Sequence, residues 1–480
     1  MKSSLYHTLH PFLMSREMAL PYLFDTRKWL STLSDGPATK ENHAHFWGND
    51  PSTLSSLSTA QFLTIGTGLD IYTSTLLSAI EAAEHEVILV TCFIANSDTL
   101  TLLCASLMRL SRKALARRDG SRIRVRLCFS SMSLLQKLLH TSSKRGHVYQ
   151  PAEWHEKLGL PHHSALEGLD LVVKTLFFRP FSVMHPKFVI TDRKRAFLPS
   201  CNVSWEVWLE CCVSVIGPVV DTLIKFWHET WAMGDHIDWS PDHQFSPSAN
   251  SFQQTQGAVS HPTPQSPTAR AFPLPTMPIF TILLPSPHHN SLFLSIPLLT
   301  PAPPQTPLNT LLLHALEHAE QSIKLITPNL TSPPVISALL DALCRGVDVH
   351  VITNRRMMTF EQVVTAATIT EVAVWKLVRK YKRLRRLRYD DSEAGRALGS
   401  LRIEYFRPIK FQESGPVKVH IKCTVVDGKV VVLGSGNMDR ASWYTSQELG
   451  IALFGEEAVR IIWEGVQGNL KRRTEEYFAV

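Results

Sequence analysis

Two copies of one polar pattern hold the residues of this sequence that are best suited to chemistry. The first copy places His, Lys, Asp, Ser and Asn at His185, Lys187, Asp192, Ser200 and Asn202. The second repeats them 235 residues later, at His420, Lys422, Asp427, Ser435 and Asn437. Chance explains poorly five coincident polar residues inside otherwise apolar runs. The spacing therefore indicates one site that receives a copy of the pattern from each half of the chain.

The residue types of this pattern suit the chemistry of a phosphodiester. A neutral imidazole is a nucleophile and a charged one is a proton donor, and a pKa of about 6.5 lets two histidines divide these tasks near neutrality. Lys187 and Lys422 lie two residues after their histidines, hence on the same strand face, where two ammonium groups neutralise phosphate oxygens. Ser and Asn side chains add hydrogen-bond donors for the same oxygens. Such a site needs no metal and no other cofactor.

The two aspartates of the pattern have a different interpretation. Asp427-Gly428 lies between the apolar runs CTVV and KVVVL, which is typical of a hairpin turn, and Asp192 begins the corresponding turn of the first copy. We expect Asp192 and Asp427 to be structural residues of these turns, outside the reacting centre.

Longer repeats surround the two copies and predict the elements that position them. Each half has a helix that runs into a strand, a second strand, and a Phe-Arg-Pro tripeptide: Leu76–Thr91 and Leu312–Thr327, 122–129 and 347–353, and Phe178–Pro180 and Phe406–Pro408. This alternation predicts an α/β fold with two duplicated domains, each a mixed β-sheet flanked by helices. Duplicated halves that pack about a pseudo-twofold axis bring equivalent segments face to face, so we expect a monomer with a pseudo-dimeric site.

Composition divides the chain into four regions. Residues 236–277 are rich in Pro, Ser, His and Gln, which is typical of a linker. We expect an N-terminal extension at 1–58, a first domain at 59–235, this linker, and a second domain at 278–480.

Bulk properties favour an intracellular protein with anionic partners. The net charge is +7, and the eight cysteines show neither a disulfide framework nor paired metal spacing. The first thirty residues lack the apolar run of a secretory signal, and prolines and histidines interrupt the apolar stretch at 279–299. We expect a cytoplasmic or peripheral membrane protein without a transmembrane helix.

The two motifs resemble the signature of the phospholipase D superfamily, which is H-x-K, four residues, D, six residues and G-S-x-N, normally present twice. The second copy fits it completely, whereas in the first copy Pro199 replaces the glycine. This resemblance implies a covalent phosphohistidine intermediate, with His185 as the nucleophile and His420 as the general acid and base. It also implies that Glu210 and Glu448, near the start of the strand after each motif, hydrogen-bond the second nitrogen of a catalytic histidine.

The resemblance favours a phospholipase D-type phosphodiesterase or phosphatidyltransferase, which cleaves a phospholipid or exchanges its head group with an alcohol, as a cardiolipin synthase-like enzyme does. A nuclease or nucleic-acid phosphodiesterase of the same superfamily is the first alternative, and a non-catalytic anionic-lipid-binding protein is the second. The DNA-adduct-repair branch typically lacks the motif aspartate, so the presence of Asp192 and Asp427 favours the lipid substrate.

Residues 374–389 predict a helix with an apolar stripe and eight cations, which is either a solvated face or a contact for a membrane or nucleic acid. Trp205, Trp208 and Trp443, which follow the motif asparagines, either line the substrate cleft or pack between the halves, and we expect packing.

Overall fold

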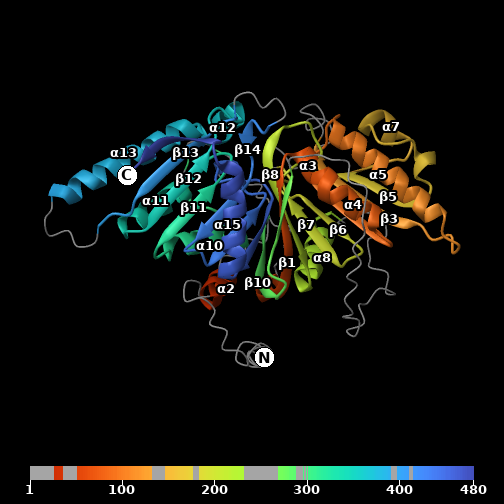
Figure 1. Cartoon of the computed structure of the whole chain (residues 1–480), viewed down its shortest axis with the longest axis horizontal. Helices are drawn as coiled ribbons and strands as arrows, with labels where there is room; N and C mark the ends of the chain where they lie inside the picture. Colours follow the sequence, from red (N-terminus) through yellow and green to blue (C-terminus); the bar gives the residue numbers. More distant parts are fainter. Residues whose placement is uncertain are drawn as a thin grey trace.

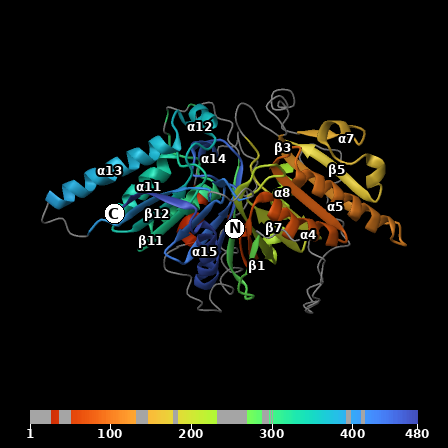
Figure 2. The same ribbon diagram turned by 45° about the horizontal axis from the view of Figure 1, so that its top comes forward.

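The fold consists of two α/β halves that lie side by side. The structure is a computed structural model of the 480-residue chain. It describes residues 26–35, 51–131, 146–176, 183–231, 269–287, 296, 299, 301–390, 397–409 and 415–480. The first half is on the right of Figure 1 and the second on the left, with β1, β8 and β10 between them. The same separation is visible in the turned view of Figure 2.

The sheet of the first half mixes parallel and antiparallel strands. Its strands run in the spatial order β4 (His147–Tyr149), β5 (Leu169–Thr175), β3 (Ile123–Ser131), β2 (Glu86–Phe93), β6 (Phe188–Thr191), β7 (Arg195–Pro199), β8 (Trp208–Ile216), β1 (Ser55–Gly66) and β9 (Arg270–Pro273). β2, β3 and β5 are parallel to one another, and the remaining pairings are antiparallel.

The sheet of the second half repeats this order. Its strands are β18 (Thr474–Ala479), β13 (Leu401–Phe406), β12 (Asp348–Thr353), β11 (Ser322–Ile326), β15 (Cys423–Val426), β16 (Val430–Gly434), β17 (Glu448–Phe454) and β10 (Ile279–Ser286). β11, β12 and β13 form the parallel part, as their counterparts do in the first half. The predicted fold class, a duplicated mixed α/β architecture, is therefore confirmed.

β1 and β10 join the two sheets. The first residues of β1 pair antiparallel with β10, from Ser55 opposite Ile282 to Ser58 opposite Ile279. The far ends of the two strands pair with β8 and β17 in the same way, Gly66 opposite Glu210 and Ser286 opposite Glu448. Equivalent strands thus meet about a pseudo-twofold axis.

Helices cover the faces of both sheets. The first half contains η1 (Pro51–Leu54), α3 (Gly68–Ile71), the π-helical turn η2 (Tyr72–Leu76), α4 (Leu77–Ala82), α5 (Asp98–Leu115), α7 (Glu153–Leu158), η3 (His163–Leu166) and α8 (Pro218–Trp231). The second contains α10 (Pro307–Glu317), α11 (Pro333–Cys344), α12 (Thr359–Ala366), α13 (Thr370–Asp390), α14 (Arg440–Tyr444) and α15 (Glu456–Leu470), and α2 (Thr26–Asp35) packs on α10. Local signals fix several starts: the Ser97 hydroxyl accepts from the Leu100 N–H at the start of α5, and Thr306 caps α10 in the same way.

One hydrophobic core runs through both halves. α8 packs on β1, β8 and β10, and its Trp227 and Trp231 are fully buried in a cluster that also contains Ile282 and Ile451. A second cluster, around Leu103 and Phe129, belongs to the first half alone. The halves are therefore fused through apolar packing as well as through the pairing of β1 with β10.

Parts of the predicted domain division lie outside the described residues. This holds for 1–25 and 36–50 of the predicted extension, for 236–268 of the predicted linker, and for Phe178–Pro180. Within the predicted linker, Arg270–Pro273 form β9, which pairs with β1. No helix of the described ranges is both long and apolar enough to cross a membrane.

Candidate active site

Each histidine segment is attached to the strand of the opposite half. The His185 N–H donates to the carbonyl of Gln447 (3.0 Å), and the His420 N–H donates to that of Leu209 (2.8 Å). β14 (Lys418–Val419), directly before His420, pairs in parallel with the start of β8. Because Gln447 and Leu209 precede Glu448 and Glu210, this crossed pairing sets each histidine beside a glutamate of the other half.

The two histidines and two glutamates form reciprocal hydrogen-bonded pairs. His185 Nδ1 lies 2.8 Å and 3.0 Å from the carboxylate oxygens of Glu448. His420 Nδ1 lies 2.7 Å from Oε1 of Glu210. The four side chains are almost enclosed, but that of His185 is 15% exposed and that of His420 only 3%. Both pairs lie at the interface of the halves, where the repeated motif predicted a single site.

These pairs set the protonation of the imidazoles. A carboxylate can only accept, so each Nδ1 carries the proton and each Nε2 of a neutral ring has a free lone pair. Burial lowers the pKa of both histidines, and the nearby lysine charges lower it further, despite the opposing effect of the glutamates. Burial, the largest single influence, would raise the pKa of Glu210 and Glu448, but the partner histidine and the serine hydrogen bonds, with the Lys422 charge at Glu210, together lower the pKa of each carboxyl. Both rings are therefore neutral at pH 7 in the free protein, beside ionised carboxylates.

Both lysines are buried in the same place. Lys187 Nζ donates to the carbonyl of its own His185 (2.9 Å), and Lys422 Nζ donates to that of His420 (2.7 Å). The charge of each lysine lowers the pKa of the histidine in the opposite half as well as in its own, so both cations lie close to both rings. Burial lowers the pKa of Lys422 to about 7, with Lys187 adding to the effect and the two glutamates opposing it.

The motif serines hold the glutamates. The Ser200 hydroxyl donates to Glu210 and accepts from the Cys211 N–H (2.9 Å), while the Ser435 hydroxyl donates to Glu448 (2.5 Å) and accepts from the Leu449 N–H (3.0 Å). In this state both serines act on the residues that orient the histidines.

The motif asparagines lie beside these serines. Asn437 Nδ2 donates to Asp439 (3.0 Å). Within the described part of the chain, Oδ1 of Asn437 and Oδ1 of Asn202 are buried without a hydrogen-bond partner. Both atoms are acceptors, so the oxygens of a phosphodiester cannot complete their contacts, and only the Nδ2 groups of the two asparagines can donate to a phosphate.

The motif aspartates lie at the turns, away from the imidazoles. Asp192 accepts from the backbone N–H groups of residues 84–86 at 2.6–3.1 Å, and Asp427 accepts from those of residues 320–322 at 2.7–2.9 Å. Both have a positive φ, 50° and 53°. They tie the turn after each motif to the start of β2 or β11.

The three tryptophans occupy three different environments: the expectation of packing is wrong for Trp205, and Trp208 fits the alternative of lining the site. Trp443 is buried, but the Trp208 ring lies 4.7 Å from the His420 ring, and Trp205 is 67% exposed. Trp208 stands two residues before Glu210 and therefore on the same strand face, a signal in the sequence that could have placed it beside the histidine.

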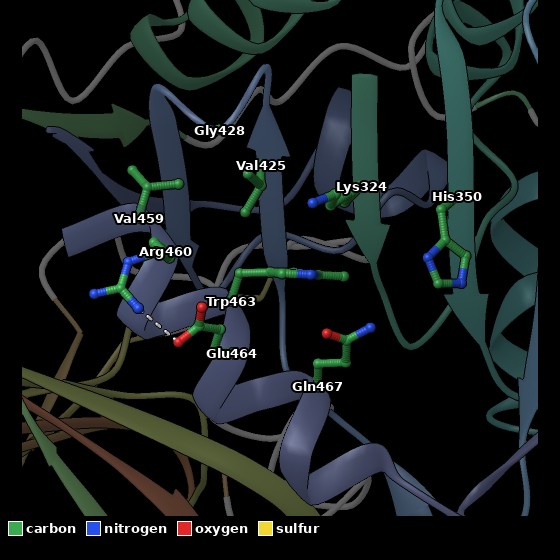
Figure 3. A pocket seen from close by; sticks show the side chains of 9 residues that line it. All are labelled: Lys324, His350, Val425, Gly428, Val459, Arg460, Trp463, Glu464 and Gln467. Carbon is green, nitrogen blue, oxygen red and sulfur yellow. Dashed lines mark hydrogen bonds and ion pairs between the residues drawn. The ribbon is translucent and has the colours of Figure 1, made fainter. Parts of the chain in front are cut away.

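A separate pocket lies on the second half, away from the catalytic histidines and lysines. It encloses about 370 Å³ between β11, β12, β15 and α15, with Trp463 as one wall and His350 and Lys324 on the sheet side (Figure 3). None of its lining residues is a motif histidine, lysine, serine or asparagine, although Gly428 belongs to the motif turn. The reactive groups are all at the interface, so we place the candidate active site there.

Comparisons with known proteins agree with this arrangement. Residues 312–467 match the family model described as cardiolipin synthase, PLD-like domain. The chain aligns with the crystal structure of a phosphatidylserine synthase from Haemophilus influenzae at 12% identity and a TM-score of 0.50, over 88% of this chain and 89% of that one. The phospholipase D family member Nuc from Salmonella typhimurium aligns over 35% of this chain and 88% of that one, at 21% identity and a TM-score of 0.24. No curated protein sequence matches the chain.

Residues 312–467, in the second half of the chain, are therefore similar to the phospholipase D-like domain of the cardiolipin synthase family. The chain as a whole is similar in fold to the phosphatidylserine synthase, and each of its halves supplies one His-x-Lys motif to the same site.

Proposed function

We propose that the protein is a phospholipase D-type phosphodiesterase or phosphatidyltransferase that acts on phospholipids. The observation that carries this proposal is the crossed pair of contacts, His185 with Glu448 and His420 with Glu210, with Lys187 and Lys422 buried beside them. Two oriented neutral imidazoles and two cations are the groups that a displacement at phosphorus requires.

The proposed reaction has two displacements at phosphorus. His185 Nε2 attacks the phosphorus, a P–N bond forms, and the bond from phosphorus to the leaving alcohol breaks. His420, whose Nε2 takes up a proton from water when the phosphodiester binds, gives that proton to the alcohol oxygen. Water or an acceptor alcohol then loses its proton to His420 as its oxygen attacks the phosphorus, and the P–N bond breaks.

The assignment of the two roles follows the exposure of the rings. His185 is the more exposed of the two and its carboxylate partner contacts it through both oxygens, which suits a nucleophile that must reach phosphorus and carry a positive charge afterwards. His420 must be protonated when it acts as an acid. Its pKa is low in the free protein, so the bound phosphate has to supply the negative charge that raises it.

The two lysines and the two asparagines complete the proposed phosphate site. Lys187 and Lys422 neutralise the non-bridging oxygens as charge develops. Asn202 and Asn437 hold the phosphoryl group, and Ser200 and Ser435 contribute through the glutamates or, after a rotation, directly.

A nuclease of the same superfamily is the second candidate, because the exposed cations of α13 suit a polyanion. A non-catalytic lipid-binding protein has less support, since binding alone does not require both histidines and both of their glutamate partners.

A direct test separates these functions. The purified protein is incubated with EDTA and either phospholipid vesicles plus a primary alcohol or labelled single- and double-stranded DNA. We expect a phosphatidyl-alcohol product and no dependence on added metal. DNA cleavage without any lipid product would contradict the lipid assignment.

Substitutions tie the activity to the site. His185→Ala and His420→Ala should each abolish product formation. His350→Ala is a matched control, because His350 forms a similar pair with Glu404 (2.5 Å) outside the motifs. Wild-type turnover in both motif variants would mean that the proposed mechanism is wrong.

A further inference from the structure

Large apolar side chains are exposed on three segments close to His420. We call this surface the apolar rim and define it by Trp205, Val207, Phe360, Val363, Trp375 and Val417. Phe360 is 78% exposed and Trp205 67%, and none of the six is less than 40% exposed. Apolar residues scattered singly on a surface need no explanation, but a group gathered in one region marks an interaction site.

Hydrogen bonds connect the three segments of the rim into one surface. The Val417 N–H donates to the carbonyl of Val207 (2.9 Å), which joins the segments from the two halves. The Asn354 side chain bonds both the N–H and the carbonyl of Val419 (2.9 and 2.8 Å), and thereby fixes the loop that leads into α12. Val207 is next to Trp208, whose ring contacts the ring of His420. Val207 and Val417 therefore lie beside the candidate active site, and the loop that leads into α12 is bonded next to them.

α12 presents the centre of this surface. Only Gln362 and Ala366 of the helix are buried, and Phe360 and Val363 face outward. In Figure 1 the helix lies next to β14, on the same side of the molecule as the start of α13. Since α12 gains little from its few buried residues, the stability of the fold does not account for the apolar residues of its outer face.

The charge around the rim is strongly positive. Residues 354–388, which run from this loop through α13, contain ten Lys and Arg against two Glu. The whole chain has a net charge of only +7, so this one segment supplies all of the excess and the rest is close to neutral. On α13, Lys376, Arg379 and Lys380 are exposed and point away from the buried stripe that contains Val374 and Leu377.

We infer that the apolar rim docks the protein on an anionic phospholipid membrane, with the basic residues of α13 on the head groups and the active site facing the bilayer. The pattern favours a membrane over a nucleic acid, because Val207, Val363 and Val417 offer no ring on which a base could stack. Aliphatic and aromatic side chains flanked by cations are instead typical of a surface that inserts at the interface of a bilayer. This inference rests on the proposed phospholipid substrate, but it concerns binding, which can be measured without turnover.

The test is flotation of the full-length protein with vesicles of phosphatidylcholine alone, vesicles with phosphatidylglycerol added, and a labelled single-stranded DNA as competitor. We expect binding to the anionic vesicles that weakens with salt. The variant Phe360→Ser/Val363→Ser/Trp375→Ser should bind them about tenfold more weakly or worse, because three interfacial side chains are lost. All three positions are exposed, so the thermal midpoint should stay unchanged.

A matched control comes from equally exposed apolar residues elsewhere. Leu115 at the end of α5 is 60% exposed and Met277, between β9 and β10, is 68% exposed. Leu115→Ser/Met277→Ser should keep wild-type vesicle binding. Equal losses in the two variants, or no loss in the rim variant, would overturn the inference. It would also fail if single-stranded DNA bound more tightly than the vesicles and the rim variant lost both together.

An inactive variant separates this inference from the proposed function. His420→Ala should bind anionic vesicles as the wild type does while it makes no product. If the wild type binds vesicles and makes no phosphatidyl product, the docking surface stands and the proposed reaction fails. If lipid is turned over and the rim variant binds and reacts normally, the proposed reaction stands and the docking surface fails.

Discussion

The two halves build the same catalytic contacts on differently packed backbones. In the second half, Leu308 of α10 packs against Gly436 and Gly450, where an added Cβ would lie 3.1 and 2.8 Å from its methyl groups. In the first half the corresponding strand positions are Cys201 and Cys212, and the helix that approaches them begins with Gly68, where a Cβ would lie 3.2 Å from that of Cys201. Tyr72, which corresponds to Leu308 in the repeat, is buried in the first half, so the first half carries larger residues here on both the helix and the strands.

This comparison separates what the chemistry requires from what the packing tolerates. The His, Lys, Ser and Glu contacts are the same in both halves within a few tenths of an ångström. The residues behind them differ, and the ring of His185 is more exposed than that of His420. The halves therefore share one set of contacts but offer two different environments, which is the basis for giving the two histidines different roles.

The largest expected effect is the loss of one histidine, and it tests the division of roles. A phosphodiester with a nitrophenolate leaving group needs no proton from an acid, so His420→Ala should release one equivalent of nitrophenolate in a burst and keep phosphorus on His185. His185→Ala should show no burst, and turnover of both variants on phospholipid should fall by about 1,000-fold or more. Stopped-flow absorbance and mass spectrometry of the protein measure these outcomes. A burst in His185→Ala alone would reverse the assignment.

The glutamates should have the next largest effect. Glu210→Gln and Glu448→Gln keep the shape of the partner but remove the charge that stabilises each imidazolium, so kcat should fall by about 10- to 100-fold. Glu210 contacts the proposed acid, so the fall in kcat of Glu210→Gln should be smaller with the nitrophenyl substrate. The fall in kcat of Glu448→Gln should be the same with both substrates. Steady-state kinetics with both substrates measure this difference. Glu404→Gln, at the His350 pair, is the control, and deficits that do not depend on the leaving group would remove the distinction.

A smaller effect concerns pH. The pKa of Lys422 is about 7, so its positive charge is present below that pH and is lost as the pH rises through it. We expect kcat/KM to fall by up to about tenfold per pH unit on this alkaline limb, because the free enzyme loses a cation that binds phosphate. Lys422→Arg keeps the charge and should move the limb to higher pH, at some cost in rate. Lys324→Arg, outside the motifs, should leave the profile as it is, and an unmoved limb in Lys422→Arg would assign it to another group.

The smallest effect is expected at the residue before each motif serine, and it concerns the free energy of unfolding. At Gly434 an added Cβ would lie 2.3 Å from the Leu449 carbonyl oxygen, so Gly434→Ala should lower the free energy of unfolding by about 1–3 kcal/mol. Pro199→Gly, at the equivalent position of β7, introduces no clash and should cost less than about 1 kcal/mol. Urea unfolding measures both values. Equal losses would mean that the two backbones are packed alike at this point.

The repeated motif was enough to predict the fold and to name the histidines, lysines and glutamates that the structure brings together. Strand periodicity placed each lysine beside its histidine, and turn chemistry explains why Asp192 and Asp427 lie at turns. The crossed order of the contacts, with Glu210 on His420 and Glu448 on His185, could not be read from the sequence, because it depends on the parallel attachment of β14 to β8 and of the His185 segment to Gln447.

Other features follow no local pattern. The pairing of β1 with β10 joins residues more than 200 positions apart. The exposure of Trp205 depends on how the chain runs past the tertiary contact between Val207 and Val417. The hydrogen bonds from Ser200 and Ser435 to the glutamates depend on side-chain rotamers. The sequence predicted that these serines bind the phosphate, whereas in the structure their hydroxyls donate to the glutamates.

The pairing of β1 with β10 also has a consequence for biosynthesis. β1 has left the ribosome long before Ile279 is made, and the strand that carries Glu448 is made later still. Contacts of such long sequence separation form slowly, because the intervening chain must be ordered first. We therefore expect a nascent or truncated first half to have no hydrolytic activity, since the glutamate that orients His185 and the whole second motif lie in the second half.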